Sequence, residues 1–201
     1  MSDSQTVDPL VRALMPVVLH QMANATQLLA GLEAVLSLDG GDALFGDRAD
    51  DLARTSLEVE DLGWVMAVLG SAVGADLLLA RRQPRGLEIL LPLVGKALRR
   101  ADRPAPSLPK VLPQLAPAAL DGWQTPWAVA SVLLAAGEDA HTDPPSWELA
   151  RAQEGWRLTV ARGETVMARA PSVLERLPGA RAEEAAEHLH LILPADWLLA
   201  P

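Results

Sequence analysis

The residues best suited to chemistry lie near the start of the chain, in His20-Gln21-Met22-Ala23-Asn24-Ala25-Thr26-Gln27-Leu28. His20, Asn24 and Gln27 are spaced at i, i+4 and i+7, so in a helix all three project from one side. A histidine exposed there can act as a nucleophile toward a phosphoryl donor. An amide one turn away can orient the imidazole or the phosphoryl oxygens. Spacing alone also fits an ordinary surface or interface histidine, so both interpretations stay open.

The segment that carries these residues is predicted to be a long helix. It begins at Asp8-Pro9, because Asp can cap free backbone amides and Pro suits the first helical position. Pro16 removes one backbone hydrogen bond, which predicts a kink near residues 12–16. The polar stripe of His20 lies beside an apolar seam with alternating spacings of four and three. The seam consists of Val18, Met22, Ala25, Leu29, Leu32 and Leu36.

A second helix is predicted over residues 48–79, after a turn at Asp39-Gly40-Gly41-Asp42. Its seam consists of Leu52, Thr55, Val59, Leu62, Met66, Leu69 and Val73. Two such helices joined by a short loop make an antiparallel hairpin. The hairpin alone leaves apolar side chains off the seam, namely Val17, Leu28, Val35, Leu57 and Val65. We therefore expect two hairpins to pair into a dimeric four-helix bundle.

The rest of the chain is predicted to mix helices with strands. Helices are expected over 87–100 and 125–139, and a short one over 173–177 or 182–187. Strands are expected over 146–153, 156–162, 166–170 and 188–193, with an edge strand at 110–112. The predicted fold class is therefore α+β, with a helical hairpin at 1–82 and a small α/β domain at 83–201.

Composition excludes several classes of function. A net charge of -9 argues against a general nucleic-acid binder, although Arg81–Arg103 forms a basic zone. The absence of Cys excludes disulfides and zinc-thiolate sites. The chain has no secretory signal and no apolar run of the about 18–20 residues that span a bilayer. We therefore expect a cytoplasmic protein that binds no membrane.

The hairpin and its His-x-x-x-Asn spacing resemble the dimerisation-and-phosphoacceptor hairpin of sensor histidine kinases and histidine phosphotransferases. The resemblance covers residues 8–80. It implies that His20 carries the phosphoryl group, that Asn24 and Gln27 orient it, and that the chain is a homodimer whose partner is a response-regulator receiver domain. It also implies no cofactor or metal of its own, because the receiver supplies the magnesium. Many members carry an acidic residue directly after the histidine, where this chain has Gln21.

Residues 124–163 are similar to part of the ATP-binding domain of those kinases, but the ligands differ. Ser131 and Ala135 stand where the family has two Asn that hold magnesium and phosphate, and only Glu138 is kept. Ala161 stands where the family has the Asp that accepts a hydrogen bond from adenine. An alanine supplies no oxygen to either the metal or the base. The resemblance therefore implies a degenerate, pseudokinase-like domain that does not bind ATP in the usual manner.

The leading hypothesis is a histidine phosphotransfer protein of two-component phosphorelay signalling, a phosphohistidine carrier rather than a kinase. The alternative is a non-catalytic dimeric scaffold or regulator that binds a signalling partner through the same hairpin. A module that binds nucleic acid or a regulator through its basic zone is a third interpretation. His188 and His190 alternate along a strand, which fits an exposed strand face better than a metal pair. Glu183, Glu184 and Glu187 are interpreted as a solvated helix.

Overall fold

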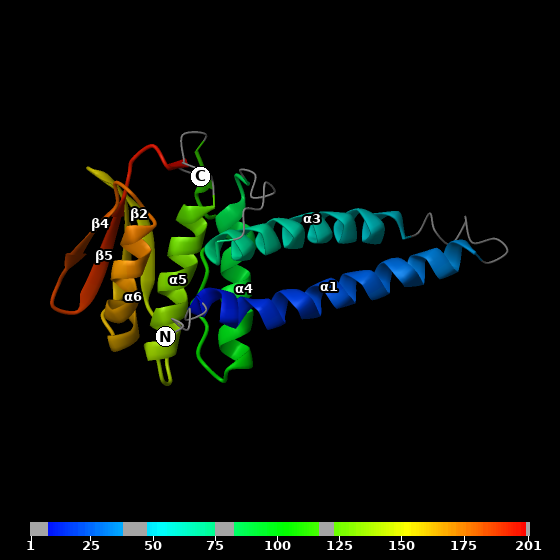
Figure 1. The fold of residues 1–201 in the computed structure, drawn as a ribbon, viewed down its shortest axis with the longest axis horizontal. Helices are drawn as coiled ribbons and strands as arrows, with labels where there is room; N and C mark the ends of the chain where they lie inside the picture. The colour runs from blue at the N-terminus through cyan, green and yellow to red at the C-terminus, as the bar shows by residue number, and fades with distance from the viewer. Residues whose placement is uncertain (1–7, 38–47, 75–82, 117–122, 200–201) are drawn as a thin grey trace, which may run out of the picture.

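Two long antiparallel helices project from the rest of the molecule (Figure 1). The computed structural model describes residues 8–37, 48–74, 83–116 and 123–199. In it, α1 (Pro9–Leu36) packs along α3 (Ala49–Ala72). The Asp8 carboxylate caps α1 as expected, since it accepts hydrogen bonds from the amides of Leu10 at 2.9 Å and Val11 at 3.4 Å. The turn predicted at 39–42 and the end of the second helix near 79 lie outside the described residues.

The apolar seam of α1 divides into two stripes with different surroundings. Val18, Ala25 and Leu32, spaced by seven residues, are buried in the hairpin. The other half of the seam, which consists of Met22, Leu29 and Leu36, is exposed. Leu57 and Val59 are exposed on α3 as well. The hairpin therefore leaves an uncovered apolar surface along its outer part.

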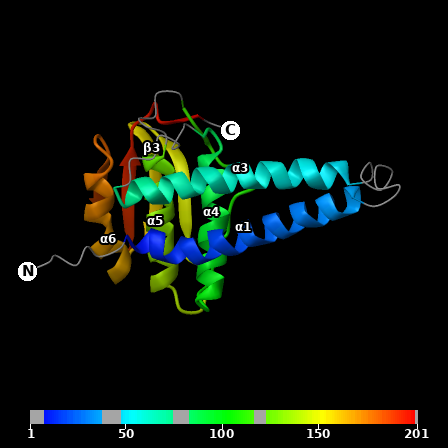
Figure 2. The same cartoon turned by 45° about the vertical axis from the view of Figure 1, so that its right-hand side comes forward.

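Two of the off-seam side chains that a lone hairpin would leave exposed are buried. Val17 is 5% exposed and Val65 is 0% exposed, because the base of the hairpin packs against the remainder of the chain. α1 continues as one helix through Pro16. Figure 2 shows α1 and α3 crossing α4 and α5.

The centre of the molecule is α5 (Gln124–Asp139), which lies between α4 (Gly86–Arg100) and α6 (Glu164–Glu175). Every residue of α5 from Thr125 to Gly137 is buried. A helix that is apolar on all sides belongs inside a core, and its Ala- and Leu-rich sequence suits both the helix and the burial. α4 ends with Arg99 and Arg100 in its last turn, where the helix dipole favours cations.

A four-stranded antiparallel sheet closes the molecule on the side away from the hairpin. Its strands are β2 (Trp147–Ala152), β3 (Gly155–Ala161), β4 (Arg181–Glu184) and β5 (His188–Leu193), in the order β2-β3-β5-β4. One face is buried against the helices, and it carries Trp156, Leu158, Val160, Leu189, Leu191 and Leu193. A smaller sheet pairs β1 (Gln114–Leu115) with β6 (Leu198–Leu199).

The predicted strands at 146–153, 156–162 and 188–193 are confirmed, with the β2–β3 turn at Gln153-Glu154. Gly155 has a φ of 150°, and a Cβ there would collide with the Leu193 carbonyl oxygen, so the residue after this turn must be glycine.

Two strand predictions for the second half are wrong, and the short helix occupies only one of its two predicted places. The segment 166–170 is helical, because Val166, Ala170 and Val173 are buried at i, i+4 and i+7 within α6. Of the two places predicted for the short helix, 173–177 overlaps the end of α6, whereas in 182–187 β4 pairs with β5 and presents Glu183 and Glu184 to solvent. The short strand of the Pro-rich segment lies at 114–115 rather than 110–112, where its partner β6 comes from the C-terminal end of the chain.

The α+β class is thus confirmed: helices packed at the N-terminal side are followed by an antiparallel sheet with helices. None of the described helices combines the length and apolarity needed to cross a lipid bilayer. The division at 82/83 stays a prediction.

Candidate functional site

His20 lies on the outer face of α1, where the hairpin leaves the body of the molecule. Val17 and Val18 in the preceding turn are buried, whereas His20 and Asn24 are exposed. The Nδ2 atom of Asn24 lies 3.5 Å from Nε2 of His20, at the outer limit of a hydrogen bond. The i, i+4 spacing therefore does bring the imidazole and the amide together, on a face open to a partner.

Gln27, the third predicted site residue, is also exposed on α1 one turn further along. The three side chains form a polar stripe next to the exposed apolar stripe of Met22, Leu29 and Leu36. The hairpin thus presents an imidazole and two amides beside an exposed apolar stripe.

A cleft of about 280 Å³ opens on the neighbouring side of α1, between α1, α3 and α4. We call it the α1–α3–α4 cleft, and its charged walls are mixed in sign. It is lined among others by Gln21, Asp61, Glu88, Arg54, Arg85 and Lys96. Gln21, which the sequence marked only as a missing carboxylate beside His20, has its side chain in this cleft.

The Asp61 carboxyl, in this cleft, has a raised pKa. Burial raises the pKa of the Asp61 carboxyl above its ordinary value, and Glu58, Glu60 and Glu88 add to this, while Arg85 at 3.8 Å opposes it. Arg85 pairs more closely with Glu88, at 3.1 Å.

Two acceptors in this cleft are buried without a hydrogen-bond partner among the described residues, Oδ1 of Asp61 and Oε1 of Gln21. Unpaired buried acceptors are uncommon in folded proteins. Neither residue was predicted, since the packing of α4 against the hairpin creates this cleft.

A second group of polar residues lies between α5 and α6. Ser131 and Ala135, which stand where the resemblance expects Asn, are buried in α5. The Glu138 carboxylate accepts a hydrogen bond from Arg169 of α6 at 2.8 Å, and the same guanidinium donates to the Ser131 carbonyl oxygen at 3.3 Å. Ala161 ends β3. The one carboxylate that the resemblance retains is therefore held by an arginine.

Asp139, the last residue of α5, caps the N-terminus of α6. Its carboxylate accepts hydrogen bonds from the amides of Thr165 and Val166, each at 3.0 Å. Burial alone would raise the pKa of Asp139, but the hydrogen bonds from Thr165 and Val166, helped by Arg169, hold it below its ordinary value. A Cβ at Gly163 would collide with this carboxylate, which explains the glycine just before α6.

His188 and His190 stack on the outer face of β5, with ring centroids 6.2 Å apart. Nδ1 of His190 lies 3.0 Å from Oγ1 of Thr159 on the paired strand. Within the described ranges, no three His, Asp or Glu side chains gather closely enough to hold a metal ion.

No protein-family model matches the chain, and no curated protein matches it either.

Proposed function

We propose that this protein is a histidine phosphotransfer protein, which passes phosphoryl groups between His20 and the aspartate of receiver domains. One observation carries the proposal: an exposed histidine on a long helical hairpin has an amide, Asn24, 3.5 Å from its Nε2 atom. Exposure is essential, because two proteins must bring a histidine and an aspartyl phosphate into line.

The chemistry requires little beyond position. An unprotonated ring nitrogen of His20 attacks the phosphorus of the partner's aspartyl phosphate, a P–N bond forms, the acyl P–O bond breaks, and the aspartate leaves as a carboxylate. The reverse reaction returns the phosphoryl group. Asn24, and Gln27 one turn on, orient the imidazole and the phosphoryl oxygens. The magnesium ion that neutralises the phosphoryl oxygens comes with the receiver, so catalysis here is mainly alignment.

The α1–α3–α4 cleft is the docking position that best suits the partner. Gln21 lines the cleft and is next to His20 in the chain, so a domain that extends from the cleft past Gln21 would reach the imidazole.

A homodimer follows from the exposed apolar stripe. Met22, Leu29 and Leu36 recur every seven residues, the repeat by which one helix packs along another. Gly31 lies among them, and a Cβ there would have no atom within 4 Å, which leaves room for the close approach of a helix. Two hairpins would cover these stripes in a four-helix bundle.

The C-terminal part fits a kinase-like domain that has lost its nucleotide site. The position that the resemblance gives to a second Asn is Ala135, which is 0% exposed, and Glu138 is paired with Arg169. No kinase activity of its own is therefore proposed.

The test uses receiver domains phosphorylated with acetyl phosphate, desalted and mixed with the full chain. Acid-labile, base-stable phosphate should appear on this chain, and it should not appear with a receiver whose phosphorylated aspartate is changed to Asn. If no receiver labels the chain, the proposal fails. A receiver that binds but never transfers its phosphoryl group would favour the scaffold instead.

A further inference from the structure

The basic zone of the sequence is only partly free to meet a partner. At the start of α4, Arg85 pairs with Glu88 at 3.1 Å and lies 3.8 Å from the Asp61 carboxylate. These two carboxylates neutralise its charge. Residues 81–82 lie outside the described residues. The cations that remain for a partner are therefore those in the second half of α4.

Three cations share the solvent face at the end of α4, namely Lys96, Arg99 and Arg100. Their spacing of i, i+3 and i+4 places them on one side of the helix. All three are exposed, and within the described ranges none of them forms an ion pair with a carboxylate. Glu88 on the same face lies about 12 Å before Lys96 along the helix and is held by Arg85. We call the three residues the α4 basic surface.

Two negative contributions at this end of α4 are smaller than the positive charge. Asp102 follows the helix and is exposed, but Arg103 is next to it in the chain. The dipole of α4 places about half a negative charge at its C-terminal end. The three cations of the α4 basic surface exceed both together.

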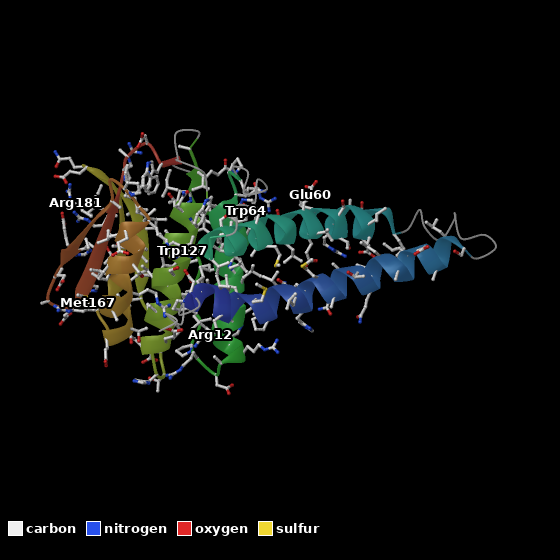
Figure 3. The ribbon with its side chains drawn as sticks, viewed as in Figure 1. Arg12, Glu60, Trp64, Trp127, Met167 and Arg181 are labelled. Carbon is white, nitrogen blue, oxygen red and sulfur yellow. The ribbon has the colours of Figure 1, made fainter. Side chains whose placement is uncertain are left out.

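The α4 basic surface begins beside the proposed phosphoacceptor. Lys96 lines the α1–α3–α4 cleft together with Gln21, the neighbour of His20 in the chain. Arg12 of α1 is also exposed and forms no ion pair among the described residues. Figure 3 shows Arg12 on the side of α1 from which the end of α4 projects, whereas Glu60 of α3 points away on the opposite side.

The partner in the proposed reaction brings negative charge to His20. A phosphorylated side chain carries about two negative charges near neutral pH. A magnesium ion beside it is bound through carboxylates as well as phosphate oxygens, and these ligands offset its charge. The face of the partner around its aspartyl phosphate is therefore acidic.

The charge of this chain makes the local surface decisive for such a partner. With a net charge of -9, the chain repels an acidic face except where its own surface is positive. In about 0.15 M salt, charges on the surface act over about 8 Å, so the nearest cations dominate the final approach.

We propose that the α4 basic surface binds the acidic face of the protein that donates the phosphoryl group to His20, a role that rests on phosphotransfer at His20. The surface attracts this face and turns the aspartyl phosphate toward the imidazole. A nucleic acid suits it less, because Glu58, Asp61 and Glu88 line the cleft next to Lys96 and interrupt the extended positive track that a chain of phosphates needs.

The test measures the initial rate at which a limiting amount of phosphorylated receiver domain labels the full chain. Salt is raised from about 10 mM to about 1 M, which shortens the range of electrostatic attraction from about 30 Å to about 3 Å. The triple variant Lys96→Gln, Arg99→Gln, Arg100→Gln should be labelled about tenfold more slowly than wild type at low salt. At high salt the two rates should converge, because His20 and Asn24 are unchanged.

The control is a second triple variant, Lys110→Gln, Arg157→Gln, Arg162→Gln, which removes the same net charge from exposed positions outside α1, α3 and α4. It should be labelled like wild type at every salt concentration. Thermal unfolding and light scattering check that both variants are folded and have the mass of wild type.

Equal labelling rates of the two triple variants at low salt would overturn this role of α4 and leave phosphotransfer at His20 intact. In that case, binding of a short DNA duplex to wild type but not to the α4 variant would assign the surface to nucleic acid. If no receiver labels the wild type, both the proposed function and this role fail.

Discussion

The Arg176 guanidinium donates a hydrogen bond to the Ala72 carbonyl oxygen at 2.8 Å, and so fastens the end of α6 to the end of α3 across 104 positions of the chain. The same guanidinium lies 4.7 Å from the centre of the Trp127 ring and 3.8 Å from the Asp8 carboxylate. One side chain thus contacts both ends of the hairpin and the central helix α5. The hairpin therefore depends on the C-terminal half for its position.

Changing Arg176 to Gln should lower the free energy of unfolding by about 1–3 kcal/mol, because a carbonyl hydrogen bond and a cation–π contact are lost together. Urea denaturation measures this. The matched control, Arg157→Gln, removes an exposed arginine of β3 and should change the stability by about 0.5 kcal/mol or less. An equal loss of unfolding free energy in the two variants would contradict a stabilising role for the Arg176 contacts.

Changing Leu29 to Glu should convert a dimer into a folded monomer. Leu29 is 36% exposed in the single chain, so the new carboxylate reaches water in the monomer but is buried in a paired bundle. Light scattering gives the mass of each form. Ala34→Glu serves as the control and should leave the dimer intact. Ala34 is exposed, and it lies on the polar stripe two heptads after His20.

Leu62→Glu is a poor test of pairing, since Leu62 is 4% exposed in the single chain and its replacement would unfold the hairpin itself. A wild-type chain that is monomeric at micromolar concentration would contradict the bundle.

Magnesium-ATP should not bind saturably at millimolar concentration. Ala135 and Ala161 offer no side-chain oxygens, and the Glu138 carboxylate is held by Arg169 at 2.8 Å. Isothermal titration calorimetry is the direct measurement. A saturable isotherm would place this chain with the active kinases.

Changing Asp139 to Asn should destabilise the protein by about 1 kcal/mol at neutral pH, because a charged cap of α6 becomes neutral. The pKa of Asp139 in the folded protein lies below its ordinary value of 3.8. Its contribution is therefore complete above that value and is lost as the pH falls through the lower folded-state pKa.

The difference between Asp139→Asn and wild type should accordingly shrink in acid, which urea titrations at several pH values would reveal. Asp143→Asn, at an exposed position, is the control. A difference that stays constant down to pH 2.5 would contradict the role of this charge.

Local signals predicted the first half of the fold well. The Asp8-Pro9 cap, the paired seams and the spacing of His20 and Asn24 all depend on residues within a few turns of one another. The seams could not show which stripe is covered, because Val18 and Met22 are equally apolar and only the packing of α3 buries one and exposes the other.

The errors in the second half arise from contacts between distant residues. The short-range pattern of residues 166–170 predicts a strand, whereas the helix α6 that forms there is capped by Asp139, 26 positions before Thr165. The cleft at Asp61 and the Arg169–Glu138 pair likewise depend on packing between separate elements. The periodicity within one segment does not show which distant segments pack against it.

The measurement that tests phosphotransfer most directly is labelling of His20→Ala by a phosphorylated receiver domain. Because His20 is exposed, its truncation should leave fold and dimer intact while it removes the nucleophile. Asn24→Ala should slow labelling without abolishing it. We expect phosphate on wild type and on variants with Ala at His141, His188 or His190, and none on His20→Ala; phosphate that persists on His20→Ala would contradict the proposed function.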